Sequence, residues 1–136
     1  MVGILVVSHG NLAEGLLDAM KMIVGEQEQL DFLSLKPTDS IEGLTKKIIT
    51  TATAINRGDG VLIFTDLFGA SPFNASGMAS QECNFPVDVI TGFNLGMLIE
   101  TIMSREGLSL EELSTMAADA GKSSIQKLSE MMANKQ

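Results

Sequence analysis

A single histidine, His9, occurs among the 136 residues of the chain. Any role of an imidazole as nucleophile, general base or metal ligand therefore falls on this residue. A nucleophilic histidine needs one bare ring nitrogen, while a hydrogen-bond acceptor holds the other nitrogen and fixes the tautomer. An isolated histidine is more often structural. His9, however, follows an apolar run from Val2 to Val7 and precedes Gly10, and this position favours chemistry.

Asp66 is the best-placed acceptor for the second ring nitrogen. It comes directly after the run Val61 to Thr65, which has the composition of a buried strand. Ligands of open parallel sheets bind outside the carboxyl ends of the strands, where the strand order reverses. Because His9 and Asp66 both follow strands, we expect them at the same edge of one sheet.

Two predicted helix starts accompany this pair, at Asn11 and at Ser71. Free backbone N–H groups and the helix dipole make such a start a binding site for anions, phosphate among them. Ser71 resembles an N-cap, and Pro72 fits the first helical position. Asp66, Gly69 and Ser71 also fit ordinary turn or cap roles when taken singly. In combination they predict a phosphoryl group held on the nitrogen of His9 that points away from Asp66.

The elements that must position these residues follow an α/β pattern. Strand-like runs alternate with segments of helical period, which predicts βαβ units and one doubly wound, mainly parallel open sheet with helices on both faces. The expected strands are residues 2–7, 30–35, 61–65 and 87–91. We expect a single domain over residues 1–136.

Apolar spacing and capping signals predict the helices between these strands. In the first, the apolar face is expected to comprise Leu12, Leu16, Ala19 and Ile23. The expected start signals are Asn11 with Glu14, Asp39 with Glu42, Ser71 with Pro72, Asn94, and Ser109 with Glu112. The last of these helices is expected to run through Ala120, and the segment 122–132 to form either a helix or a short strand.

Composition excludes several classes of function. The 17 acidic and 9 basic residues give a net charge of -8, which is the wrong sign for binding nucleic acid or an anionic membrane surface. Cys83 is the only cysteine, so an internal disulfide and a multi-cysteine zinc site are excluded. No apolar run approaches the ~20 residues that span a bilayer, and no secretory leader is recognisable. We therefore expect a cytoplasmic protein without membrane insertion.

Three motifs give a family resemblance that spans nearly the whole chain. They are Val6-Val7-Ser8-His9-Gly10, the run from Thr65 to Asn74 that reads TDLFGASPFN, and the run from Gly92 to Leu98 that reads GFNLGML. In this order and spacing they closely resemble the IIA component of the mannose-family sugar phosphotransferase system. The second motif departs from the pattern of this family at two places. Ala70 stands where many relatives have a second glycine, and Leu67-Phe68 replaces a Thr-Trp type pair.

The resemblance implies a mechanism and partners. His9 is expected to accept a phosphoryl group from phosphohistidine of HPr and to pass it to a IIB component, without a metal or other cofactor. Asp66 is expected to orient the imidazole. The residues expected to bind or support the phosphoryl group are Gly10, Gly69, Ser71 and Asn94. The family fold further implies a homodimer that exchanges an antiparallel C-terminal strand. Since no IIB domain precedes the end at Gln136, a separate IIA protein is expected.

Other functions fit the residues less well. The phosphotransfer subunit of dihydroxyacetone kinase shares the fold and the early histidine, but the Ser71-Pro72-Phe73-Asn74 run favours sugar transport. A receiver domain phosphorylated on Asp66 needs an acidic pair after the first strand, where the chain has Ser8-His9. A serine hydrolase and a dinucleotide site lack their glycine motifs. A binding module that leaves His9 unphosphorylated is a further alternative.

Overall fold

A four-stranded, all-parallel sheet forms the centre of the computed structural model, which describes residues 1–133. The strands are β1 (Gly3–His9), β2 (Leu30–Leu35), β3 (Val61–Thr65) and β4 (Val87–Thr91). The last three match their predicted ranges. β1 begins one residue after the predicted start and extends to His9, so the histidine is its final residue.

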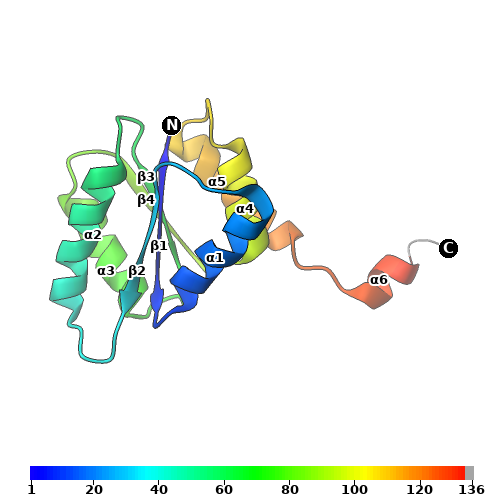
Figure 1. Cartoon of the computed structure of the whole chain (residues 1–136), viewed down its shortest axis with the longest axis horizontal. Coiled ribbons are helices and arrows are strands. Elements are labelled where there is room, and N and C mark those ends of the chain that lie inside the picture. The colour runs from blue at the N-terminus through cyan, green and yellow to red at the C-terminus, as the bar shows by residue number, and fades with distance from the viewer. Residues whose placement is uncertain (134–136) are drawn as a thin grey trace.

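The strand order β2-β1-β3-β4 places the two central strands side by side. The chain passes from β1 to β2 on one side and then crosses to β3 on the other side, so the strand order reverses at this point (Figure 1). Val7 of β1 pairs with Thr65 of β3. The residues that follow these strands, which include Asp66, therefore lie next to the end of β1.

Helices cover both faces of the sheet (Figure 1). Those on one face are α1 (Leu12–Val24), α4 (Leu95–Ser104) and α5 (Leu110–Ser123). Those on the other face are α2 (Ile41–Ile55) and α3 (Ser71–Glu82). The predicted doubly wound arrangement is confirmed for the parallel sheet and its two layers of helices.

Alternating side chains of β1 supply both hydrophobic cores. Ile4 and Val6 pack under α1, α4 and α5, whereas Leu5 and Val7 pack under α2 and α3. All four side chains are completely buried. A strand that is apolar on both faces is typical of the centre of a parallel sheet, and it fixes the position of His9 at its end.

The buried face of α1 differs from the predicted one. Ala13, Leu17 and Met20 are buried, whereas Leu12 and Ile23 are 52% and 60% exposed. Each buried residue comes one position after a predicted one, which corresponds to a rotation of about 100° around the helix axis. The helix has apolar residues on two adjacent faces, so periodicity alone could not select the one that meets the sheet.

Three of the expected helix caps are also wrong. Asn11 precedes α1 without a side-chain cap bond, so the expected pair with Glu14 does not form a capping box. Ser40, rather than Asp39, caps α2 by accepting a hydrogen bond from the backbone of Gly43. Ala70 occupies the N-cap position of α3, which makes Ser71 its first helical residue.

Two other caps follow the prediction. Asn94 caps α4 through the backbone of Met97, and Ser109 and Glu112 form a reciprocal capping box on α5. Helix α5 continues past the predicted end at Ala120 to Ser123.

The C-terminal segment contains a helix where a short strand was the alternative. Helix α6 (Leu128–Ala133) has no buried residue and lies away from the rest of the molecule in Figure 1. Residues 134–136 lie outside the part of the chain that the structure describes.

Candidate functional site

His9 lies at the carboxyl edge of the sheet, where β1 ends and the chain turns into α1. Gly10 makes this turn at a φ of +52°, in the left-handed region that favours glycine. The His9 side chain is 50% exposed, so its ring is accessible from outside. Its Nδ1 lies 2.8 Å from Oδ2 of Asp66, which confirms the predicted proximity of the two residues.

Asp66 holds the histidine through a single carboxylate oxygen. Oδ2 accepts one hydrogen bond from the His9 backbone N–H at 2.8 Å and a second one from Nδ1 at 2.8 Å. Burial of the carboxyl opposes its ionisation, but the hydrogen bonds and the charge of His9 outweigh burial and hold the pKa of Asp66 below its ordinary value. The carboxylate is therefore ionised at neutral pH, and its side chain is only 10% exposed.

The ionised carboxylate determines which ring nitrogen of His9 carries the proton. A carboxylate can only accept hydrogen bonds, so Nδ1 must be the donor. In the neutral imidazole, Nε2 then keeps its lone pair. The arrangement can therefore serve as a nucleophile whose reactive nitrogen is Nε2.

Ser8 holds the backbone of His9 in place, a role that the sequence motifs did not indicate. Its side chain is completely buried. The hydroxyl accepts a hydrogen bond from the Ala13 backbone at 2.7 Å and donates one to the His9 carbonyl at 3.2 Å. It thus ties the end of β1 to the first turn of α1 and supplies the contact expected of Asn11. In the sequence, the signal for this role was a polar residue directly after an apolar run.

Gly69 lies in the segment that connects β3 to α3, and Ser71 is the first residue of α3. Gly69 has a φ of +76°, and its carbonyl accepts a hydrogen bond from the Asn74 side chain at 2.9 Å. Ser71 is in the first turn of α3, a turn without acidic residues. The first turn of α3 therefore contributes no carboxylate of its own to offset the positive end of the helix dipole, which favours a nearby anion.

The side chain of Asn94, which was expected to bind or support the phosphoryl group, is engaged in hydrogen bonds within the chain. Its Oδ1 accepts hydrogen bonds from the Met97 backbone at 2.8 Å and from the Ser124 hydroxyl at 2.9 Å. Its Nδ2 donates to the Gly121 carbonyl at 3.0 Å. Asn94 thus joins the start of α4 to the end of α5.

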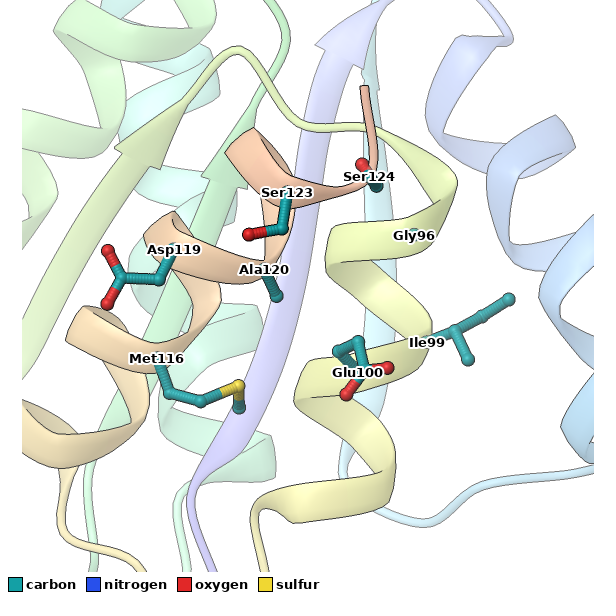
Figure 2. Close-up of a pocket in the computed structure, with 8 residues that line it drawn as sticks. All are labelled: Gly96, Ile99, Glu100, Met116, Asp119, Ala120, Ser123 and Ser124. Atoms are coloured by element: carbon teal, nitrogen blue, oxygen red, sulfur yellow. The ribbon is translucent and has the colours of Figure 1, made fainter. Parts of the chain in front are cut away.

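A hollow of about 500 Å³ lies elsewhere, between α4 and α5 (Figure 2). Ile99, Met116 and Ala120 give it an apolar lining, and Glu100 and Asp119 also line it. Neither His9 nor Asp66 lines this hollow, so the hollow and the candidate site lie at different places on the molecule.

Two further features of residues 1–133 bear on function. Their histidine, cysteine, aspartate and glutamate side chains form no group of three or more that could hold a metal ion. In the same part of the chain, no helix has both the length and the apolar character needed to cross a membrane.

Comparison with known proteins gives consistent matches. The family model described as PTS system fructose IIA component matches residues 3–118. The PTS system mannose-specific EIIAB component of Escherichia coli (strain K12) is 33% identical over 93% of this chain, which spans 39% of the length of that relative. The PTS system sorbose-specific EIIA component of Lacticaseibacillus casei is 31% identical over 81% of this chain and 78% of its own length.

A solved structure extends the similarity to three dimensions. It is the phosphotransferase system component EIIA from Streptococcus agalactiae, which is 27% identical and superimposes with a TM-score of 0.88. The match covers 96% of this chain and 99% of that one.

Proposed function

Because this chain belongs to the family of PTS system fructose IIA components, we propose that it is a phosphoryl carrier of the sugar phosphotransferase system. In this proposal, His9 accepts the phosphoryl group from phosphohistidine of HPr and passes it to a histidine of a IIB component. The relatives carry the names of different sugars, mannose and sorbose among them, so the similarity identifies the system rather than one sugar.

The observation that carries this proposal is the contact between Nδ1 of His9 and Oδ2 of Asp66 at 2.8 Å. In the first transfer, the lone pair on Nε2 attacks phosphorus. The N–P bond of phospho-HPr breaks, and its electron pair returns to the imidazole of the donor. In the second transfer, an imidazole of IIB attacks phosphorus, and the bond to Nε2 breaks with its electron pair returning to His9.

Positioning accounts for most of what the protein contributes to these steps. The donor and acceptor nitrogens must lie in line across phosphorus, while hydrogen-bond donors stabilise the equatorial oxygens. The N-terminal turn of α3 and the segment containing Gly69 are suited to supply such donors. Asp66 also offsets the positive charge that the ring acquires when Nε2 is phosphorylated.

The proposal includes the setting in which the carrier acts. We place it in the cytoplasm as a single domain, in transient contact with HPr and IIB and without a cofactor. We also propose a homodimer that exchanges the segment after Ser123. Ile125 and Leu128 in this segment are 78% and 72% exposed, which supports a role in covering a second copy.

The direct test is to incubate the protein with phosphoenolpyruvate, enzyme I and HPr and to measure its intact mass. We expect one added, acid-labile phosphate on the native chain and none on His9→Ala. Circular dichroism of His9→Ala serves as the control for folding, which should be unchanged because the ring is half exposed. An equal amount of phosphate on His9→Ala would disprove the assignment of the nucleophile.

A further inference from the structure

Asn94 makes more hydrogen bonds than the cap of a helix requires. Its Oδ1 accepts the cap bond of α4 from the backbone of Met97 at 2.8 Å. The same oxygen accepts a hydrogen bond from the Ser124 hydroxyl at 2.9 Å, and Nδ2 donates one to the Gly121 carbonyl at 3.0 Å. The last two bonds do not belong to the cap, because they hold the end of α5 against the start of α4.

The two helix ends that Asn94 joins are also closely packed. A Cβ atom built at Gly96 would lie 2.6 Å from Cβ of Ser124, so the first turn of α4 touches the end of α5 (Figure 2). Only a residue without a side chain permits this approach. Asn94 is therefore held in place by α5 as well as by its own helix.

The backbone of the same loop, residues 92–94, reaches the strand that precedes Asp66. The N–H groups of Gly92 and Phe93 donate to the Thr65 carbonyl at 3.0 and 3.4 Å. This carbonyl and the N–H group of Asp66 belong to one planar peptide unit. The two donors that orient the carbonyl therefore also orient the chain where it enters Asp66.

The carboxylate of Asp66 depends on its backbone for its position. Its Oδ1 is buried and has no hydrogen-bond partner within residues 1–133. Its Oδ2 is bonded to the backbone and the ring of His9. No side chain other than His9 is thus hydrogen-bonded to this carboxylate in the described part of the chain, and a shift of the peptide unit would move it.

We propose that Asn94 is a positioning residue for the pair of His9 and Asp66, an inference that rests on the proposed function. Asn94 ties the loop 92–94 to α5, and the loop holds the Thr65 carbonyl. A hydrogen bond weakens steeply as its geometry departs from the optimum. The bond of 2.8 Å between Asp66 and Nδ1 of His9 is therefore sensitive to the place of this loop.

The single histidine of the chain gives a direct readout of this bond, because its ring gives one pair of nitrogen NMR signals. With isotope-labelled histidine, the neutral ring of the native chain should be protonated on Nδ1 and bare at Nε2. The informative variant is Asn94→Ser. Serine also caps helices well, but its side chain is one atom shorter and loses the bond to Gly121. The two signals should move toward each other, because the displaced Asp66 no longer selects one tautomer.

Transfer from phospho-HPr gives the second measurement. Asn94 acts through Asp66 in this inference and does not touch the donor. We therefore expect the kcat of Asn94→Ser to fall about 3- to 10-fold while the KM for phospho-HPr stays native. Asn94→Ala, which loses the cap as well, should show the same change of the ring signals together with a lower melting temperature.

Ser109→Ala is the matched control. It removes the cap of α5 at the end of that helix opposite to Gly121, where Ser109 pairs with Glu112. This variant should lose stability but keep the native ring signals and the native kcat. If Ser109→Ala moves the ring signals as far as Asn94→Ser does, the effect follows stability alone and the inference is overturned.

The remaining outcomes separate this inference from the proposed function. Native ring signals and a native kcat in Asn94→Ser would show that Asn94 only caps α4, which overturns the inference. A raised KM with unchanged kcat would also overturn it, because Asn94 would then act on the donor. If the native chain takes no phosphate from phospho-HPr, the proposed function fails, whereas altered ring signals in Asn94→Ser still support the positioning of His9.

Discussion

At the scale of single residues, Asp66 does two separate things for His9. Its Oδ2 accepts one hydrogen bond from the backbone and one from the ring. The first fixes the position of the main chain at the end of β1, and the second fixes the tautomer. Because Asp66 is largely buried and His9 is half exposed, the carboxylate proposed to orient the ring is sheltered, while the ring itself stays accessible.

Asp66→Asn should therefore slow phosphoryl transfer without unfolding the protein. An amide can donate a hydrogen bond to the ring and thereby favour the wrong tautomer. We expect the rate of transfer from phospho-HPr to fall about 10- to 100-fold, by analogy with the loss seen when the hydrogen-bond partner of a metal-binding histidine is removed. Rapid-quench kinetics would measure this effect, and a native rate would remove Asp66 from the mechanism.

The same substitution should change how stability depends on pH. The folded chain holds the pKa of Asp66 below its ordinary value, so the ionised carboxylate stabilises the fold at pH values above about 4. This contribution is lost as the pH falls through the lowered pKa. Urea unfolding should show a smaller difference in free energy between the native chain and Asp66→Asn at pH 3 than at pH 6. A difference that is independent of pH would contradict the shift.

At the scale of elements, the helices differ in whether an N-cap side chain bonds their first turn. Ser109 and Glu112 exchange side-chain and backbone hydrogen bonds at the start of α5, whereas Asn11 makes no such bond at the start of α1. At α1 the buried hydroxyl of Ser8 bonds the Ala13 backbone instead. The residue type at the N-cap position is thus a poor guide when a buried neighbour can reach the same N–H group.

This difference predicts opposite results for two similar substitutions. Ser109→Ala removes a cap bond and should lower the free energy of unfolding by about 1 kcal/mol. Asn11→Ala removes no cap bond and should change stability by less than about 0.5 kcal/mol. Urea denaturation of both variants measures these effects, and equal losses would show that Asn11 caps α1 in solution.

At the scale of the whole molecule, the crossing of the chain from β2 to β3 creates the site. It places β1 and β3 side by side, so residues 57 positions apart in the sequence meet at one edge. The opposite edge is closed by the buried Arg105, whose guanidinium donates to the carbonyls of Val2 and Gln29. The edge of the sheet at Arg105 is thus closed by structural hydrogen bonds, whereas the edge at His9 remains accessible.

The exposed tail predicts association between copies. Residues 124–133 are all exposed in a single chain, although Ile125 and Leu128 are apolar. Sedimentation at micromolar concentration should give a dimer, and Leu128→Glu should shift it toward monomer because a charge would replace buried apolar surface. Met103→Glu, at another exposed apolar site, is the control. A native chain that sediments as a monomer would contradict the proposed dimer.

The sequence by itself determined the strands, the helices between them and the one residue available for imidazole chemistry. Runs such as Val61 to Thr65 are apolar on both faces, so they specify buried strands without reference to the rest of the chain. A single histidine left one candidate for imidazole chemistry, and the rule for parallel sheets placed Asp66 at the same edge.

Only the tertiary structure decided the rotation of α1, the role of Ser8 and the orientation of the histidine ring. Helical periodicity identifies apolar faces, but a helix with two of them rotates according to how it meets the sheet. Hydrogen bonds between distant residues, such as that from Nδ1 to Asp66, depend on packing over the whole domain. For this reason the sequence predicted His9 as the reactive residue, whereas only the fold showed that Nδ1 is bound to Asp66 and that Nε2 is the nitrogen left for the proposed reaction.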